Sequence, residues 1–253
     1  DAIETASFGS FSTVLTEYNI PERAYELNVA AASLAREVAS GYEADGRSRF
    51  VAGSIGPGTK LPSLGHIRFD ELHDSYFEQA RGLLDGGSDL FLIETCMDLL
   101  QIKAAMQACR KAMKIVGREI PIQVQVTMET TGRMLVGTEI GAALVALEAM
   151  RPDVIGINCA TGPAEMQEHL RHLSQHSPIP ISVLPNAGLP SPMSDTGFDE
   201  TPADTSRLLH AFAAEGLVNI VGGCCGTTPE HIFAIGQATT PLPPRLRAVA
   251  HEV

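Results

Sequence analysis

Two adjacent cysteines, Cys224 and Cys225, lie between glycines in the segment VGGCCGT. Adjacent cysteines pack a core no better than two valines would, and a disulfide between neighbours closes a strained ring outside normal disulfide geometry. The flanking glycines let the backbone turn consecutive side chains toward one point. The pattern indicates a site that needs two sulfurs at one place.

A third sulfur is expected from Cys159, which ends the apolar run DVIGINC. Asn186 lies near the end of the next run, PISVLPNAG, and the cysteine pair ends the run after that, LVNIVGGCC. If these runs are neighbouring parallel strands, about 4.8 Å apart, the three cysteines can share one ion at Zn–S distances of about 2.3 Å. Three thiolates with an open fourth position are typical of catalytic zinc, and Asn186 could lend its amide oxygen when that position is empty. The alternative for the three cysteines is that they are small buried hydrophobes.

The other two cysteines, Cys96 and Cys109, have no candidate ligand near them in the sequence and are expected to be buried hydrophobes. Five cysteines make an odd number and form no framework of the secreted type. Together with the lack of a signal peptide, this favours a reducing compartment and predicts a cytoplasmic protein.

Two further segments could bind a substrate. Glu94, in LFLIETC, shares a strand face with apolar residues, and a buried carboxylate must meet a cation or hydrogen-bond donors. A substrate ammonium would satisfy it, and so would an arginine. The early loop ASFGS, residues 6–10, has small side chains and backbone N–H groups suited to holding a carboxylate.

Short apolar runs alternate with longer amphipathic ones, which implies parallel strands joined by right-handed helical crossovers. Strands are expected at 1–5, 50–56, 90–96, 121–127, 153–159, 180–188 and 217–225. Helices are expected at 21–40, 71–86, 98–117, 138–150, 164–175, 202–215 and 228–238. The pattern predicts an α/β fold of the (β/α)8 TIM-barrel type, because polar residues follow nearly every strand. The alternative, a doubly wound open sheet, is disfavoured because no G-x-G-x-x-G follows the first strand.

Seven strand-like runs are visible where such a barrel has eight, and the chain begins at Asp1, inside a strand-like run. We therefore expect an N-terminally truncated barrel, with the first strand and helix preceding Asp1. The barrel domain is assigned to residues 1–240 and a proline-rich exit linker to residues 241–253.

The charge balance excludes several partners. The net charge is −12 and the chain has only four lysines, so a nucleic-acid or anionic-membrane surface is not expected. No apolar run approaches the ~20 residues of a membrane span.

The glycine-rich segment at 222–226 leaves open a phosphate-binding lyase or isomerase, and the cysteine pair leaves open a non-enzymatic metal-binding or redox-sensing domain.

Several motifs together resemble the homocysteine S-methyltransferase family, in its branch of cobalamin-dependent methionine synthases. They are IET at 93–95, GINC at 156–159, PNAG at 185–188, GGCCG at 222–226 and the loop GSIGPGTKLPSLG at 53–65. The resemblance covers residues 1–240. Where the family usually has Asn-Thr-Phe, this chain has Ala6-Ser7-Phe8, so an asparagine contact there is not carried over.

The resemblance implies zinc held by Cys159, Cys224 and Cys225, with the sulfur of L-homocysteine as fourth ligand. It implies that Glu94 holds the substrate's amino group and that backbone near Ser7 and Phe8 helps bind its carboxylate. The implied methyl donor is methylcobalamin on a separate domain, recharged from methyltetrahydrofolate bound by a further domain. The alternative is a stand-alone enzyme that uses S-methylmethionine or betaine.

Overall fold

The computed structural model describes residues 1–194 and 197–246. Its strands are β1 (Ala2–Glu4), β2 (Phe50–Ile55), β3 (Leu90–Cys96), β4 (Ile122–Val126), β5 (Val154–Asn158), β6 (Ile181–Leu184) and β7 (Ile220–Val221). Its helices are α1 (Ser12–Leu15), α2 (Ala24–Gly41), α3 (Phe69–Asp85), α4 (Leu99–Val116), α5 (Ile140–Met150), α6 (Pro163–His176), α7 (Pro202–Ala214) and α8 (Pro229–Thr239). Short 3-10 turns lie at η1 (Thr16–Tyr18), η2 (Pro21–Arg23), η3 (Glu43–Asp45) and η4 (Pro62–Leu64).

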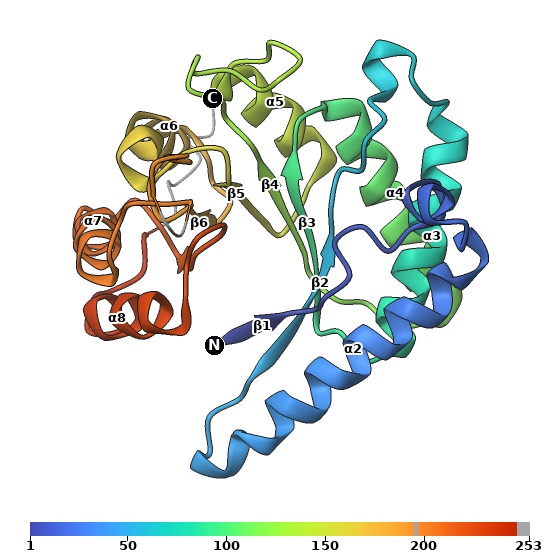
Figure 1. The fold of residues 1–253 in the computed structure, drawn as a ribbon, viewed down its shortest axis with the longest axis horizontal. Helices are drawn as coiled ribbons and strands as arrows, with labels where there is room; N and C mark the ends of the chain where they lie inside the picture. Colours follow the sequence, from blue (N-terminus) through green and yellow to red (C-terminus); the bar gives the residue numbers. More distant parts are fainter. Residues whose placement is uncertain (195–196, 247–253) are drawn as a thin grey trace. The chain divides into compact units, whose positions relative to one another are not determined.

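Strands and helices alternate along the chain as expected, and Figure 1 shows the long helices flanking the strands. Within the described residues the strands follow one another in chain order, from β1 to β7. A doubly wound sheet would reverse its strand order at a switch point, so the sequential order confirms the TIM-type α/β class with seven strands. No helix in the described part of the chain is long and apolar enough to cross a membrane.

The chain divides into two compact units, residues 1–124 and the residues from 125 onward. In the first unit β1 pairs with β2 and β2 with β3, all parallel. Helix α3 lies between α2 and α4 and contacts both. Asp98 begins α4: its buried side chain accepts a hydrogen bond from the Leu100 N–H and two more from Ser63, which anchors the 53–65 loop.

In the second unit β5 pairs with β6 and β6 with β7, again parallel. The segments predicted to open helices do so. Thr201 caps α7 with Pro202 in its first turn, and Thr228 forms a capping box with His231 at the start of α8. Because β5, β6 and β7 pair in parallel, their carboxyl ends lie at one edge, where the predicted cysteine site lies.

The predicted exit linker falls partly outside the described residues. Within it, Arg245 is buried, with 4% of its surface exposed. Its guanidinium donates to the carbonyls of Ser174, Ser177 and Ile179, and its own carbonyl accepts from Asn219. This contact fixes the chain as far as Arg245 against the second unit.

Candidate metal centre

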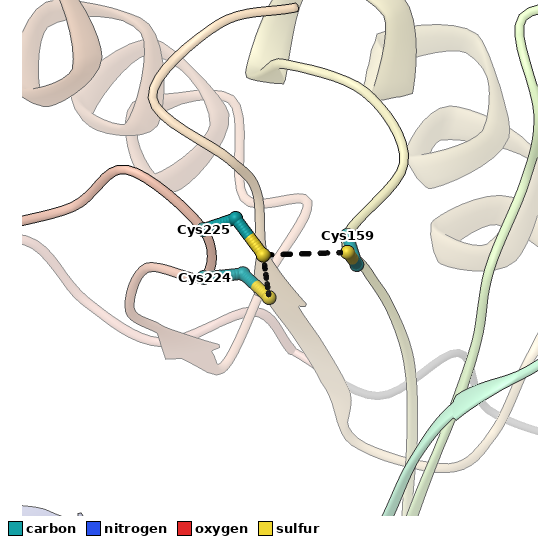
Figure 2. A group of neighbouring side chains, drawn as sticks. All are labelled: Cys159, Cys224 and Cys225. Carbon is teal, nitrogen blue, oxygen red and sulfur yellow. Dashed lines mark hydrogen bonds between the residues drawn. The ribbon is translucent and has the colours of Figure 1, made fainter. Parts of the chain in front are cut away.

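Three cysteine sulfurs converge in the second unit (Figure 2). The Cys225 sulfur lies 3.8 Å from that of Cys159 and 4.0 Å from that of Cys224, and all three lie within 4.8 Å of one another. Cys159 follows β5 directly, and the pair follows β7. Cys159 and Cys224 are half-buried while Cys225 is exposed, so the group opens to solvent on the Cys225 side.

The backbone of Cys159 is unusual. Cys159 and Ala160 both adopt left-handed conformations, with φ of 61° and 60°. Such conformations cost an L-residue roughly 1–2 kcal/mol each, and they gather at functional sites where the surroundings enforce them. Hydrogen bonds from the Cys159 N–H to the Leu184 carbonyl and from the Thr161 N–H to the Cys159 carbonyl hold this turn. The turn ends the strand alternation and redirects the Cys159 side chain.

The cysteine pair is held by the segment that follows β6. The Cys224 N–H donates to the Pro185 carbonyl at 2.8 Å, and the Cys225 carbonyl accepts from the Ala187 N–H at 2.9 Å. Gly226 is required here, because it has a φ of 78° and a Cβ at this position would lie 2.4 Å from the Phe198 ring. The pair therefore has a fixed place relative to the end of β6.

Asn186 lies within this group of contacts and is almost fully buried, at 1% exposed. Its side-chain oxygen accepts from the Cys225 N–H at 3.1 Å, and its side chain also makes a hydrogen bond to the Cys159 sulfur. The residue thus reaches two of the three cysteines.

The three thiols differ in pKa. Hydrogen bonds from Cys224, from the Ala160 N–H, from Cys225 and from Asn186 lower the pKa of Cys159 to about 6, against the opposing effect of burial. The pKa of Cys224 is raised, chiefly because its thiol donates to Cys159, and burial raises that of Cys225. The lowered pKa makes Cys159 the first thiol of the group to ionise.

Sequence reasoning missed one residue of this group. Asn158 is fully buried at the end of β5, and its side-chain amide donates to the Cys224 sulfur at 3.9 Å. In a regular strand, Asn158 and Cys159 would point to opposite faces, so alternation gives no signal that both serve one site. Only the left-handed backbone at Cys159 makes this possible.

Cys96 and Cys109 are both fully buried and free, and burial raises the pKa of each thiol. Within the described residues, the Cys159, Cys224 and Cys225 group is the one set of three or more potential metal ligands close enough to share an ion. The prediction that Cys96 and Cys109 are buried hydrophobes is confirmed.

In the first unit, Glu94 is buried on β3, with 5% of its surface exposed. The Ser54 hydroxyl donates to its carboxylate at 2.5 Å. Glu4, on β1, interacts with it: burial, followed by the charge of Glu94, raises the pKa of Glu4 to about 7. Two carboxyl groups therefore interact here, and the sequence had indicated only one of them.

Ser7 and Phe8 lie near the same network. The Ser7 hydroxyl donates to the Ser54 carbonyl at 2.8 Å, and the Ser7 N–H donates to the Thr5 carbonyl. Phe8 is half-exposed, and its carbonyl accepts from the Gly56 N–H. The Ser7 N–H is thus used inside the protein, whereas the Phe8 N–H has no acceptor among the described residues.

The raised pKa of Glu4 predicts a pH-dependent stability. A carboxyl whose pKa rises on folding stabilises the folded state below its unfolded value of 4.5, and this contribution is lost as the pH rises through about 7. In the Glu4→Gln variant, the free energy of unfolding should fall less between pH 4.5 and 7, because glutamine does not ionise. The variant should therefore be more stable than wild type above pH 7, as measured by urea unfolding at a series of pH values. Glu26→Gln, at an exposed carboxylate whose pKa is lowered by Arg23, should show no such gain. Parallel stability profiles of wild type and Glu4→Gln would contradict the carboxyl coupling.

Comparison with known proteins gives a consistent family assignment. The family described as homocysteine S-methyltransferase matches residues 1–239. The methionine synthase of Mycobacterium tuberculosis (strain ATCC 25618 / H37Rv) is 49% identical over 253 residues, which is 100% of this chain and 21% of that protein. The methionine synthase of Mycobacterium leprae (strain TN) is 50% identical over 239 residues, 94% of this chain and 20% of that protein. The chain thus spans about a fifth of the length of these relatives.

Solved structures give the same fold. The metallated form of the homocysteine methyltransferase MmuM from Escherichia coli matches with a TM-score of 0.74 at 22% identity, over 93% of this chain and 78% of that chain. Its oxidized form matches with a TM-score of 0.72 at 21% identity, over the same shares.

Proposed function

The chain belongs to the homocysteine S-methyltransferase family, and from this premise we propose that it transfers a methyl group to the thiol of L-homocysteine, forming methionine, with zinc bound by Cys159, Cys224 and Cys225. The observation that carries the proposal is the convergence of three cysteine sulfurs at one strand edge.

The spacing of the sulfurs fits zinc. Tetrahedral coordination at a Zn–S distance of about 2.3 Å separates two sulfurs by about 3.8 Å. The Cys225 sulfur lies 3.8 and 4.0 Å from its two neighbours, so little movement is needed to bind the ion. Three protein sulfurs leave a fourth position for the substrate sulfur. Asn186, whose oxygen already contacts the Cys225 N–H, is the residue we propose for that position when substrate is absent.

Zinc bound here would deprotonate the homocysteine thiol, which is mostly protonated at neutral pH like that of free cysteine. Three cysteine thiolates outweigh the charge of the ion, which keeps the substrate sulfur electron-rich. That sulfur would supply the electron pair of the new S–CH3 bond, while the bond between the methyl group and its donor breaks and its electron pair stays with the donor; the thiol proton leaves to solvent. Glu94 supplies negative charge for the substrate ammonium, and the free Phe8 N–H is suited to its carboxylate.

For the methyl donor we propose methylcobalamin carried by another domain and recharged from methyltetrahydrofolate. The support is that the related methionine synthases are about five times longer than this chain, which leaves room for such domains. A cage for the quaternary ammonium of betaine needs aromatic rings, and the chain has no tryptophan and only four tyrosines. We place the protein in the cytoplasm, where its free cysteines would stay reduced.

To identify the methyl donor, zinc-loaded protein is incubated with homocysteine and one donor at a time: free methylcobalamin, betaine or S-methylmethionine. Methionine formation is measured by mass spectrometry. We expect slow, zinc-dependent methionine formation with methylcobalamin and no comparable turnover with the other two. Rapid turnover with S-methylmethionine and none with methylcobalamin would instead favour the stand-alone branch of the family.

Zinc binding should release protons. At neutral pH the Cys159 thiol, with its pKa of about 6, is already ionised, while the raised pKa values of Cys224 and Cys225 keep those thiols protonated. Ligation requires all three as thiolates, so about two protons should leave per zinc near neutral pH, and affinity should rise with pH. Calorimetric titration in buffers of different ionisation enthalpy measures this number. Release of no protons would show that the cysteines are not the ligands.

A further inference from the structure

Two sulfurs of the cysteine group, those of Cys159 and Cys224, accept hydrogen bonds from nitrogen as well as lying near the other sulfurs. Cys159 accepts from the Ala160 N–H and from the Asn186 side chain. Cys224 accepts from the side-chain amide of Asn158 at 3.9 Å. One asparagine from the end of β5 and one from the segment after β6 thus reach different sulfurs.

The position of Asn158 leaves its side chain little freedom. It is fully buried, its residue pairs with Leu184 of β6, and its carbonyl accepts from the Thr127 hydroxyl at 3.0 Å. A buried amide is costly unless its polar atoms are hydrogen-bonded. Its donation to the Cys224 sulfur is an interaction that an aliphatic side chain of similar size could not make.

The acceptor that needs it is a thiolate. Three cysteine thiolates around a divalent ion carry net negative charge, and the proposed substrate thiolate adds another. Partly buried negative charge requires donors, and a hydrogen bond to an ionised acceptor is roughly twice as strong as a neutral one. Such a bond withdraws electron density from the sulfur, so it controls how much of that density reaches the metal.

We propose that Asn158 is a positioning residue of the metal site: its side-chain amide donates to the Cys224 thiolate, holds that sulfur in place and limits the charge that it gives to the metal. This inference rests on the proposed zinc site and extends it to a residue that binds neither metal nor substrate. It predicts changes in the absorption spectrum and the affinity of the bound metal, which a purely structural role of a buried amide would not cause.

The test uses the protein loaded with cobalt(II), whose sulfur-to-cobalt charge-transfer band reports electron density on the thiolates. In Asn158→Leu, which lacks the donor, and in Asn158→Asp, which keeps the shape but replaces the N–H with oxygen, the band should move to longer wavelength. Zinc affinity, measured by competition with a chromophoric chelator, should fall about 10- to 100-fold in both, as expected for lost support of a metal ligand.

Asn219→Leu is the matched control. Asn219 lies in the same unit, where its side chain accepts from the Ile181 N–H at the start of β6 and donates to the Arg245 carbonyl, at the opposite end of that strand from the cysteines. This variant should lose stability but keep the wild-type band and zinc affinity.

A second measurement needs no variant to fold. In the wild-type protein loaded with cadmium-113, a side-chain amide proton of Asn158 should show scalar coupling to the metal through the N–H···S bond. An unchanged charge-transfer band and zinc affinity in the Asn158 variants, or the absence of that coupling if neither variant folds, would overturn the inference. Failure of the wild-type protein to bind any of these metals would instead overturn the zinc site itself.

Discussion

Replacing Cys225 with serine is expected to remove nearly all zinc from the protein and, with it, methyl transfer to homocysteine. The Cys225 sulfur lies within 4.0 Å of both other cysteine sulfurs, so its loss leaves two thiols that cannot make the three-sulfur set. A serine hydroxyl does not ionise near neutral pH and is a far poorer zinc ligand than a thiolate. Metal content is measured by elemental analysis after purification under reducing conditions.

The buried cysteines supply the control for this experiment. Cys159→Ser and Cys224→Ser should lose zinc as Cys225→Ser does, whereas Cys109→Ser should retain one zinc per chain, because Cys109 is fully buried within α4. If Cys225→Ser kept its full zinc content, the proposed site would be wrong.

Replacing Glu94 with glutamine should raise the homocysteine KM about 10- to 150-fold and leave zinc content unchanged, since a charge-assisted hydrogen bond contributes about 1.5–3 kcal/mol. Glutamine keeps the size of the side chain and removes the charge that would bind the substrate ammonium. Steady-state kinetics with homocysteine varied at saturating methyl donor give the KM.

Ser54→Ala gives a graded comparison for Glu94. It removes the hydroxyl that donates to the Glu94 carboxylate but keeps the charge, so its effect on KM should be smaller than that of Glu94→Gln. An unchanged KM in Glu94→Gln would make the buried carboxylate a structural group only.

The order of strands and helices could be predicted from the sequence because apolar runs and helix-opening signals recur along the chain. Helix α1 was not predicted, since its four residues are too short to show helical periodicity. The last strand was expected at 217–225, but β7 contains only Ile220 and Val221. The strand ends before the glycines at 222 and 223, so the cysteine pair lies in a loop, which hydrogen bonds to the segment after β6 hold in place.

The convergence of the three cysteines could also be predicted, because consecutive parallel strands bring their carboxyl ends to one edge. The nitrogen donors around the sulfurs could not. Asn158 contacts Cys224 only because the left-handed backbone at Cys159 breaks strand alternation, and such a conformation leaves no sequence signal at a cysteine. Glu4 was missed because the three residues of β1 are too few to show a buried face, although its carboxyl group interacts with Glu94.

The most direct test of the account is X-ray absorption spectroscopy at the zinc edge, with and without homocysteine. We expect three sulfur neighbours and one lighter atom at zinc in the protein alone, and four sulfurs at about 2.3 Å after homocysteine is added. The fourth sulfur would show that the three cysteines hold zinc with one position open for the substrate thiol. A sulfur count that homocysteine leaves unchanged would contradict the central claim that this site activates the homocysteine sulfur.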